Sequence, residues 1–112
     1  MSETLRVGFV GTGRMATALA GGLVSSGFCA ADEIVGSDVV PAASEAFARA
    51  TGGSVVDSNA GVAAESDVIV LAVKPQQMSE VLAGLAPAIT DDHLVVSIAA
   101  GITLQTLADG LG

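Results

Sequence analysis

The chain contains no tryptophan and no tyrosine, and three phenylalanines are its only aromatic residues. Its hydrophobic content of 51% nevertheless excludes an intrinsically disordered chain, because the apolar residues are numerous enough to form a core. That core must consist mainly of Val, Leu, Ile and Ala side chains. Small aliphatic side chains of this kind favour helices packed closely against a parallel sheet.

Basic residues are scarce as well: four Lys and Arg stand against twelve Asp and Glu, and the formal net charge is −8. A nucleic-acid partner needs a basic face that neutralises phosphates, so the charge balance argues against one. It argues in the same way against an anionic membrane surface. Residues 15–31 carry no charge, but they include several Gly and Ser residues and fall short of the length that spans a bilayer. We expect neither nucleic acid nor membrane as a partner.

Cysteine and histidine each occur once, as Cys29 and His93. One cysteine cannot form an internal disulfide, which is typical of a reducing compartment, and two such residues cannot assemble a zinc cluster. The first residues lack the basic stretch and unbroken apolar core of a signal peptide. We expect a soluble, cytoplasmic protein without a metal site, in which Cys29 is a small buried apolar residue. His93 is expected to be a surface or capping residue.

Short apolar runs alternate with helical patterns along the chain. Strands are predicted over residues 5–10, 34–37, 54–56, 68–73 and 94–98, and helices over 14–26, 41–51, 59–64, 76–85 and 103–112. This alternation predicts right-handed crossovers and one parallel sheet. The fold class is therefore α/β: a single domain over residues 1–112 with a Rossmann-type doubly wound sheet of about five strands in the order 3-2-1-4-5. The sixth strand that normally follows is missing.

Three details of the helices are also predicted. The spacing of apolar residues in the first helix predicts a buried face made of Met15, Ala18, Leu19, Gly22 and Leu23. Gly27 is predicted to end that helix, and Asn59 to cap the third helix.

A glycine-rich turn separates the first predicted strand from the first predicted helix. Gly11, Gly13 and Ala16 match the G-x-G-x-x-G/A pattern that is typical of dinucleotide-binding domains. Gly11 permits the tight turn, and Gly13 lets the backbone approach a pyrophosphate closely. The backbone amides of Gly13, Arg14 and Met15 would then point at the phosphates, assisted by the helix dipole. The alternative is a plain glycine turn with a packing role only.

Two polar residues end the second predicted strand, where the adenosine ribose of a dinucleotide lies. Asp38 would accept hydrogen bonds from both ribose hydroxyls and repel a 2′-phosphate, which favours NAD(H). Ser37 is compatible with either cofactor, and Arg14 is near enough in sequence to meet a phosphate. The local signals therefore conflict, and a solvated turn residue is the alternative for Asp38.

Residues after the fourth and fifth predicted strands complete the expected cleft. Ala72 leaves room for a cofactor, and Pro75 holds Lys74 extended, so that Lys74 either contacts a phosphate or ribose oxygen or is a plain surface lysine. Residues 99–101 are small where a nicotinamide ring would reach. We find no nucleophile–base pair and predict no catalytic residue.

Three sequence strings together resemble pyrroline-5-carboxylate reductases: VGFVGTGRMA at residues 7–16, LAVKPQ at 71–76 and VVSIAAGIT at 95–103. They occur in order over essentially the whole chain, and the AVKP and SxAAGxT strings are more specific than the glycine turn. The resemblance implies NAD(P)H binding by Gly11, Thr12, Gly13, Arg14, Met15, Ser37, Asn59, Ala72, Val73, Lys74, Pro75, Ile98, Ala99 and Ala100. Members of the family commonly use NADPH, so NADP(H) is favoured and NAD(H) remains possible, because Asp38 argues against a 2′-phosphate.

The resemblance also implies a reaction, hydride transfer from nicotinamide C4 to the C=N carbon of Δ1-pyrroline-5-carboxylate in proline biosynthesis. Members of the family continue with a sixth strand and a helical domain that dimerises and forms the site of the imine substrate. Neither follows Gly112. We therefore expect this chain to be an N-terminal piece that binds cofactor without being active alone, and the full-length enzyme to be a homo-oligomer.

Two other interpretations remain open. One is a related reductase, such as a β-hydroxyacid dehydrogenase or an F420-dependent NADP reductase. The glycine turn excludes neither, whereas the AVKP and SIAAG strings argue against both. The other is a stand-alone nucleotide-sensing domain without catalysis, which would account for the lack of catalytic side chains.

Overall fold

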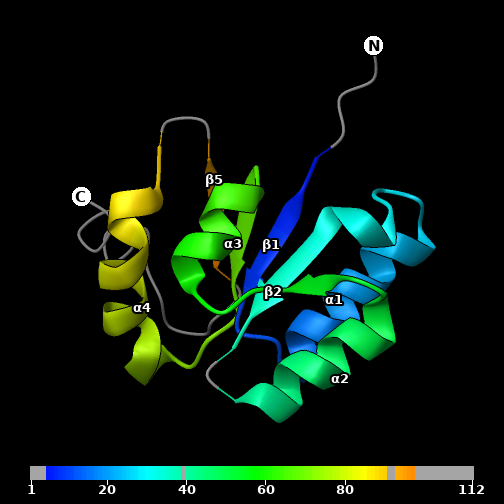
Figure 1. The fold of residues 1–112 in the computed structure, drawn as a ribbon, viewed down its shortest axis with the longest axis horizontal. Helices are drawn as coiled ribbons and strands as arrows, with labels where there is room; N and C mark the ends of the chain where they lie inside the picture. The colour runs from blue at the N-terminus through cyan, green and yellow to red at the C-terminus, as the bar shows by residue number, and fades with distance from the viewer. Residues whose placement is uncertain (1–4, 39, 91–92, 98–112) are drawn as a thin grey trace.

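The computed structural model describes residues 5–38, 40–90 and 93–97. Along the chain it contains β1 (Val7–Val10), α1 (Arg14–Ser25), the 3₁₀ turn η1 (Ala31–Glu33), β2 (Ile34–Ser37), α2 (Pro41–Thr51), β3 (Ser54–Val55), α3 (Asn59–Glu65), β4 (Val68–Leu71), η2 (Pro75–Gln77), α4 (Met78–Leu85), η3 (Ala86–Ala88) and β5 (Leu94–Ser97). All strand pairs are parallel, in the order β3-β2-β1-β4-β5 (Figure 1). The predicted α/β class and strand order are confirmed.

Two hydrophobic clusters form the core, one on each face of the sheet. One cluster joins strand residues such as Val10 and Ile69 to α3 and α4, and it contains mainly Val, Leu and Ile. The other joins strand residues such as Phe9 to α1 and α2. Phe9 packs there against Phe47 of α2, with 5.6 Å between the ring centroids. Helices therefore cover both faces, as the doubly wound fold requires.

The buried face of α1 differs from the predicted one. Ala16 and Ala20 are the buried residues of this helix, whereas Met15 is 63% exposed and Leu19 is 38% exposed. Small alanine side chains let the helix backbone lie close to the sheet. Among the predicted members of the face, Ala18 and Gly22 are also exposed, and only Leu23 is half-buried. The predicted face was therefore wrong.

The ends of two helices test the predicted caps. Gly27, with φ of +80°, follows the last turn of α1, and Phe28 N–H donates to the Leu23 carbonyl at 3.0 Å. This is a Schellman arrangement, so the predicted end at Gly27 is confirmed. Ser58, not Asn59, caps α3, because its Oγ accepts a hydrogen bond from Gly61 N–H at 3.0 Å. The predicted Asn59 cap was wrong, since Asn59 is already helical and its side chain binds elsewhere.

Most strands are shorter than predicted. β1 begins at Val7 and β4 ends at Leu71, two residues inside the predicted bounds in each case. β5 ends at Ser97 within the described residues. The predicted last helix lies outside the described residues.

Cys29 and His93 have the structural roles expected of them. Cys29 is 7% exposed, and burial raises the pKa of its thiol, with a further rise from the Glu33 carboxylate. His93 Nδ1 accepts a hydrogen bond from Thr90 N–H at 2.9 Å, and its Nε2 lies 2.8 Å from the Ala63 carbonyl oxygen. Because the first bond makes Nδ1 an acceptor, Nε2 carries the proton and donates to Ala63. His93 therefore anchors the chain before β5 to α3.

We expect Cys29 to react slowly with iodoacetamide in the folded chain. Its thiol is buried, and a raised pKa keeps the reactive thiolate scarce as the pH approaches the ordinary cysteine value. Mass spectrometry over time at pH 8 should show alkylation that is roughly tenfold or more faster in concentrated urea than in buffer. Equal rates in both solutions would contradict this burial.

The part of the chain that the structure describes contains no helix of sufficient length and hydropathy to cross a membrane. The same residues include no group of three side chains suited to hold a metal ion.

Gly22 offers a simple test of the α1 packing. A Cβ at Gly22 would meet no atom within 4 Å. Gly22 is exposed to solvent and lies several residues from either end of α1. Gly22→Ala should therefore stabilise the chain by about 0.5–1 kcal/mol, because alanine loses less backbone entropy in a helix. Thermal unfolding followed by circular dichroism measures the shift, and a lower melting temperature would contradict the predicted exposure.

Candidate cofactor site

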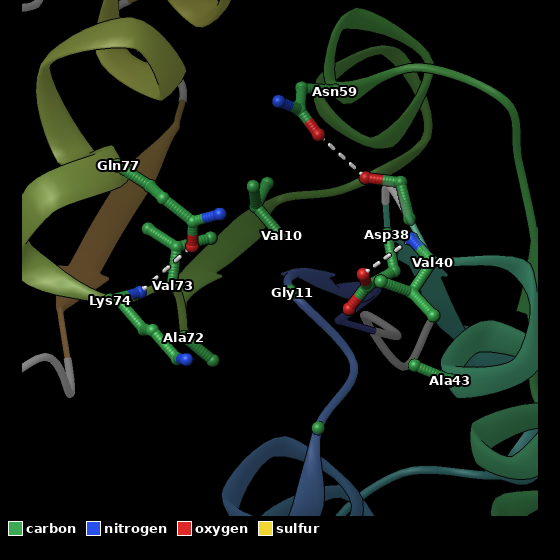
Figure 2. Close-up of a pocket in the computed structure, with 12 residues that line it drawn as sticks. Val10, Gly11, Asp38, Val40, Ala43, Asn59, Ala72, Val73, Lys74 and Gln77 are labelled. Atoms are coloured by element: carbon green, nitrogen blue, oxygen red, sulfur yellow. Dashed lines mark hydrogen bonds between the residues drawn. The ribbon is translucent and has the colours of Figure 1, made fainter.

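The register of the sheet brings the carboxyl ends of its strands to one level. Val10 at the end of β1 pairs with Ser37 of β2 and with Leu71 of β4. The residues that follow these three positions therefore meet at one edge of the sheet, where parallel α/β folds bind ligands. A cavity of about 330 Å³ lies there (Figure 2). Its lining consists of Val10, Gly11, Gly13, Ser37, Asp38, Val40, Ala43, Asn59, Ala72, Val73, Lys74 and Gln77.

Gly11 sits in a narrow space between two strand ends. Its φ is +93°, and an added Cβ would lie 2.7 Å from the carbonyl oxygen of Ala72. Its N–H donates to the Ser37 carbonyl at 2.9 Å. Only glycine fits this conformation and this spacing. Through Gly11 the turn contacts the end of β2 and the residue that follows β4.

Gly13 has the opposite surroundings. It is the N-cap of α1 and receives no side-chain capping bond, and an added Cβ would meet no protein atom within 4 Å. Open space therefore lies in front of the N-terminus of α1, where the first backbone N–H groups have no partner within the helix. The helix dipole makes this space favourable for an anion. The turn fits a diphosphate.

Thr12 and Asp38 hold the turn against the end of β2. The N–H of Thr12 donates to Asp38 Oδ2 at 2.7 Å, and its hydroxyl donates to the same oxygen at 3.1 Å. The other carboxylate oxygen accepts from Val40 N–H at 2.9 Å. Thr12 is only 2% exposed and does not line the cavity, whereas Asp38 does. We call these two residues the Thr12–Asp38 clasp.

Ser37 and Asn59 meet on one side of the cavity, although 22 residues separate them. The Ser37 hydroxyl donates to Asn59 Oδ1 at 2.7 Å. Because the Asn59 oxygen is engaged there, its amide nitrogen is turned away from Ser37 (Figure 2). The pair therefore offers the two N–H donors of Asn59 and the lone pairs of Ser37 to a ligand.

The opposite wall follows β4. Ala72 N–H donates to the Val10 carbonyl at 2.8 Å, which holds the start of this wall beside β1. Val73 contributes an apolar surface, and the exposed Lys74 contributes a positive charge at the rim. The N–H of Lys74 donates to Gln77 Oε1 at 3.3 Å (Figure 2).

The structure brings together most residues that the sequence predicts for a cofactor site. Those that line the cavity are Gly11, Gly13, Ser37, Asp38, Asn59, Ala72, Val73 and Lys74. Thr12 lies behind the turn, Pro75 begins η2, and Arg14 and Met15 have exposed side chains at the start of α1, outside the cavity lining. The predicted Ile98, Ala99 and Ala100 lie outside the described residues.

Sequence reasoning missed four lining residues: Val10, Val40, Ala43 and Gln77. Val40 and Ala43 are apolar residues of a connection and a helix start, which no motif marks. Gln77 had a usable signal, because a Pro at the first position of a helical turn and a Gln at the third are typical of a capped N-terminus.

A comparison with protein families shows the family of the chain. The family model described as "NADP oxidoreductase coenzyme F420-dependent" matches residues 6–101. The chain belongs to this family. The description names one of the related reductases that the sequence left open, so the family alone does not separate the alternatives.

The chain is also similar to proteins named pyrroline-5-carboxylate reductase. It is 45% identical to that of Pseudomonas aeruginosa over 98% of the chain and 40% of the relative. It is 40% identical to that of Methanosarcina acetivorans over 97% of the chain and 40% of the relative. The resemblance inferred from the sequence is confirmed, and the chain spans about two-fifths of the length of these relatives.

Solved structures agree with this likeness. The chain superimposes on a pyrroline-5-carboxylate reductase from Coxiella burnetii with a TM-score of 0.90 at 30% identity, covering 98% of the chain and 41% of that structure. It superimposes on the Plasmodium falciparum pyrroline carboxylate reductase with NADP bound with a TM-score of 0.83 at 27% identity, covering 96% of the chain and 38% of that structure. The family member described here therefore has the fold of the matched part of these reductases.

Proposed function

We propose that this chain is the N-terminal, NAD(P)H-binding domain of a pyrroline-5-carboxylate reductase, an enzyme of proline biosynthesis, and that NADP(H) is its favoured cofactor. The observation that carries this proposal is the open space in front of Gly13, at the N-terminus of α1 and beside the Ser37–Asn59 pair. The names of the relatives support the choice of substrate. The NADP bound to the Plasmodium falciparum structure supports the choice of cofactor.

Each part of the cavity then has a defined role toward the cofactor. The backbone N–H groups at the start of α1 would bind the diphosphate. Asn59 and Ser37 would bind the adenosine ribose or its 2′-phosphate, and Lys74 would add a positive charge at the rim. Asp38 opposes a 2′-phosphate, so NAD(H) remains a second cofactor of this site.

The bound cofactor would supply a hydride from nicotinamide C4 to the C=N carbon of Δ1-pyrroline-5-carboxylate. The protein residues described here bind and orient that cofactor. Among the described residues the only cysteine is buried, and the only histidine anchors the opposite end of the sheet. We propose that the groups that hold the imine come from elsewhere in the enzyme.

That requirement extends the proposal to the whole protein. We propose that a helical domain beyond this chain forms the imine site and a homo-oligomer, and that the 112-residue chain binds cofactor but is inactive alone. The single buried cysteine supports a reducing compartment, and we place the protein in the cytoplasm.

Titration of the chain with NADPH and NADH by calorimetry tests this function. We expect both cofactors to bind, with NADPH the tighter, and no oxidation of NADPH when Δ1-pyrroline-5-carboxylate is added. The product of the complete gene should reduce the imine under the same conditions. Absence of binding for both cofactors would refute the proposed site. Imine reduction by the 112-residue chain alone would refute the proposed division between two domains.

A further inference from the structure

Gln77 lines the cavity and also caps the helical turn that it belongs to. Its side-chain Oε1 accepts the Lys74 N–H at 3.3 Å, and its own N–H donates to the Lys74 carbonyl at 2.9 Å. Pro75 occupies the first position of η2, and a backbone N–H at this position would have no partner within the turn. The first bond is one half of a capping box, in which a Gln at the third position binds back to the cap, and the second is the backbone bond that closes the 3₁₀ turn.

This cap determines which way the amide of Gln77 faces. A backbone N–H can only donate, so the atom that faces Lys74 must be the oxygen of the side-chain amide. The amide nitrogen therefore lies on the other side, and Figure 2 shows it directed into the cavity. Two N–H donors of Gln77 are thus held toward the ligand space by a bond that the cap itself requires.

The position of these donors indicates which part of a dinucleotide they meet. The diphosphate belongs at Gly13 and the adenosine ribose at Ser37 and Asn59, so the base attached to that ribose lies in the remaining part of the cavity. Val40 lines the cavity on the β2 side and Val73 lines it on the β4 side (Figure 2), so the base would lie between them. Two apolar walls accept the faces of a flat ring.

We infer that Gln77 is an adenine-recognition residue, whose amide N–H donates to a ring nitrogen of the adenine. This inference rests on the proposed dinucleotide function. Adenine offers acceptor nitrogens at its edge, and the side-chain amide of glutamine is a usual partner of that edge. Gln77 then links helix capping to base binding, since the same amide serves the backbone with its oxygen and the ligand with its nitrogen.

Two substitutions separate base binding from capping. Gln77→Glu keeps an oxygen acceptor for Lys74 N–H but removes the amide donors, whereas Gln77→Met removes both. Gln76→Glu is the matched control, because it adds the same charge at an exposed neighbour that does not line the cavity. Each variant of the full chain is titrated with NADPH and with ADP, which contains the adenosine half but no nicotinamide, and its melting temperature is measured.

We expect both Gln77 variants to bind NADPH and ADP roughly five- to tenfold more weakly, the effect of one lost hydrogen bond, and Gln76→Glu to bind within about twofold of the original chain. Gln77→Glu should keep the original melting temperature. The inference is overturned if both Gln77 variants bind ADP normally, or if they weaken NADPH but not ADP, which would place the donors at the nicotinamide half. If the unsubstituted chain binds neither NADPH nor NADH, the proposed function itself fails.

Discussion

Replacing Gly13 by valine should remove nearly all dinucleotide affinity while leaving the fold intact. An added Cβ at this position meets no protein atom within 4 Å, and the φ of −73° suits an ordinary residue. The valine side chain would instead fill the space where a diphosphate approaches the backbone of α1. Loss of about two hydrogen bonds to charged phosphate oxygens, each worth about 1.5 kcal/mol, weakens binding roughly 100-fold. Calorimetric titration with NADPH measures this loss.

Gly11→Ala provides the contrasting variant. Its Cβ would lie 2.7 Å from the Ala72 carbonyl oxygen at a φ of +93°, so we expect a loss of stability as well as of binding. Gly22→Ala, which lies within α1 but away from the cavity, should bind NADPH as the original chain does. If Gly13→Val bound NADPH with unchanged affinity, the diphosphate could not rest at the start of α1.

Replacing Asp38 by serine should shift the preference of the chain toward NADPH. The Asp38 carboxylate lines the cavity beside Ser37 and would face the 2′-phosphate of NADPH, but only hydroxyls of NADH. Asp38→Ser removes the repulsion between the Asp38 carboxylate and the 2′-phosphate of NADPH in a partly solvated site. The ratio of NADPH affinity to NADH affinity should therefore rise roughly tenfold or more. Parallel titrations with both cofactors measure this ratio.

Thr12→Val separates the charge of Asp38 from its role in the Thr12–Asp38 clasp. Valine has the shape of threonine but lacks the hydroxyl that donates to Asp38 Oδ2 at 3.1 Å. We expect a stability loss of about 1 kcal/mol and an equal weakening of NADPH and NADH, so that their ratio stays constant. If Asp38→Ser changed both affinities equally and left their ratio unchanged, Asp38 would be a positioning residue alone.

The sheet and the glycine turn could be predicted because both depend on local patterns. Continuous apolar runs ending in Gly, Pro or polar residues locate the strands, and alternation with helices predicts a parallel sheet. The order β3-β2-β1-β4-β5 is the commonest one for dinucleotide-binding domains. The glycine spacing follows from the backbone requirements at Gly11 and Gly13. These features need no knowledge of contacts between distant residues.

The orientation of α1 could not be predicted because its sequence contains almost no polar residues. Only Thr17 interrupts the apolar run of residues 15–24, so several helical faces have similar hydrophobicity. Ala16 and Ala20 face the sheet because their small side chains allow the closest packing of the helix against it. The predicted cap of α3 was one residue too late because Ser58 and Asn59 are adjacent and both residue types favour that position.

The polar contacts of the candidate site depend on pairs that are distant in the sequence. The Thr12–Asp38 clasp joins residues 26 positions apart, and the Ser37–Asn59 bond joins residues 22 positions apart. The polar residues that follow each predicted strand indicate that polar groups gather at one edge of the sheet. They do not indicate which of these groups form hydrogen bonds with each other. The position of Asp38 after β2 predicts a contact with the ribose, whereas its bonds to Thr12 and Val40 depend on the fold.

The attachment of the turn to two strands also bears on the thermodynamics of binding. Gly11 donates a hydrogen bond to Ser37 at the end of β2, and Thr12 donates to Asp38, which follows it. Gly11 also lies so close to Ala72 that an added Cβ would be 2.7 Å from the Ala72 carbonyl oxygen. The backbone that receives the diphosphate is therefore preorganised, and association should carry little entropic penalty from loop ordering. Dinucleotide binding to this half of the enzyme would then resemble docking onto a rigid receptor.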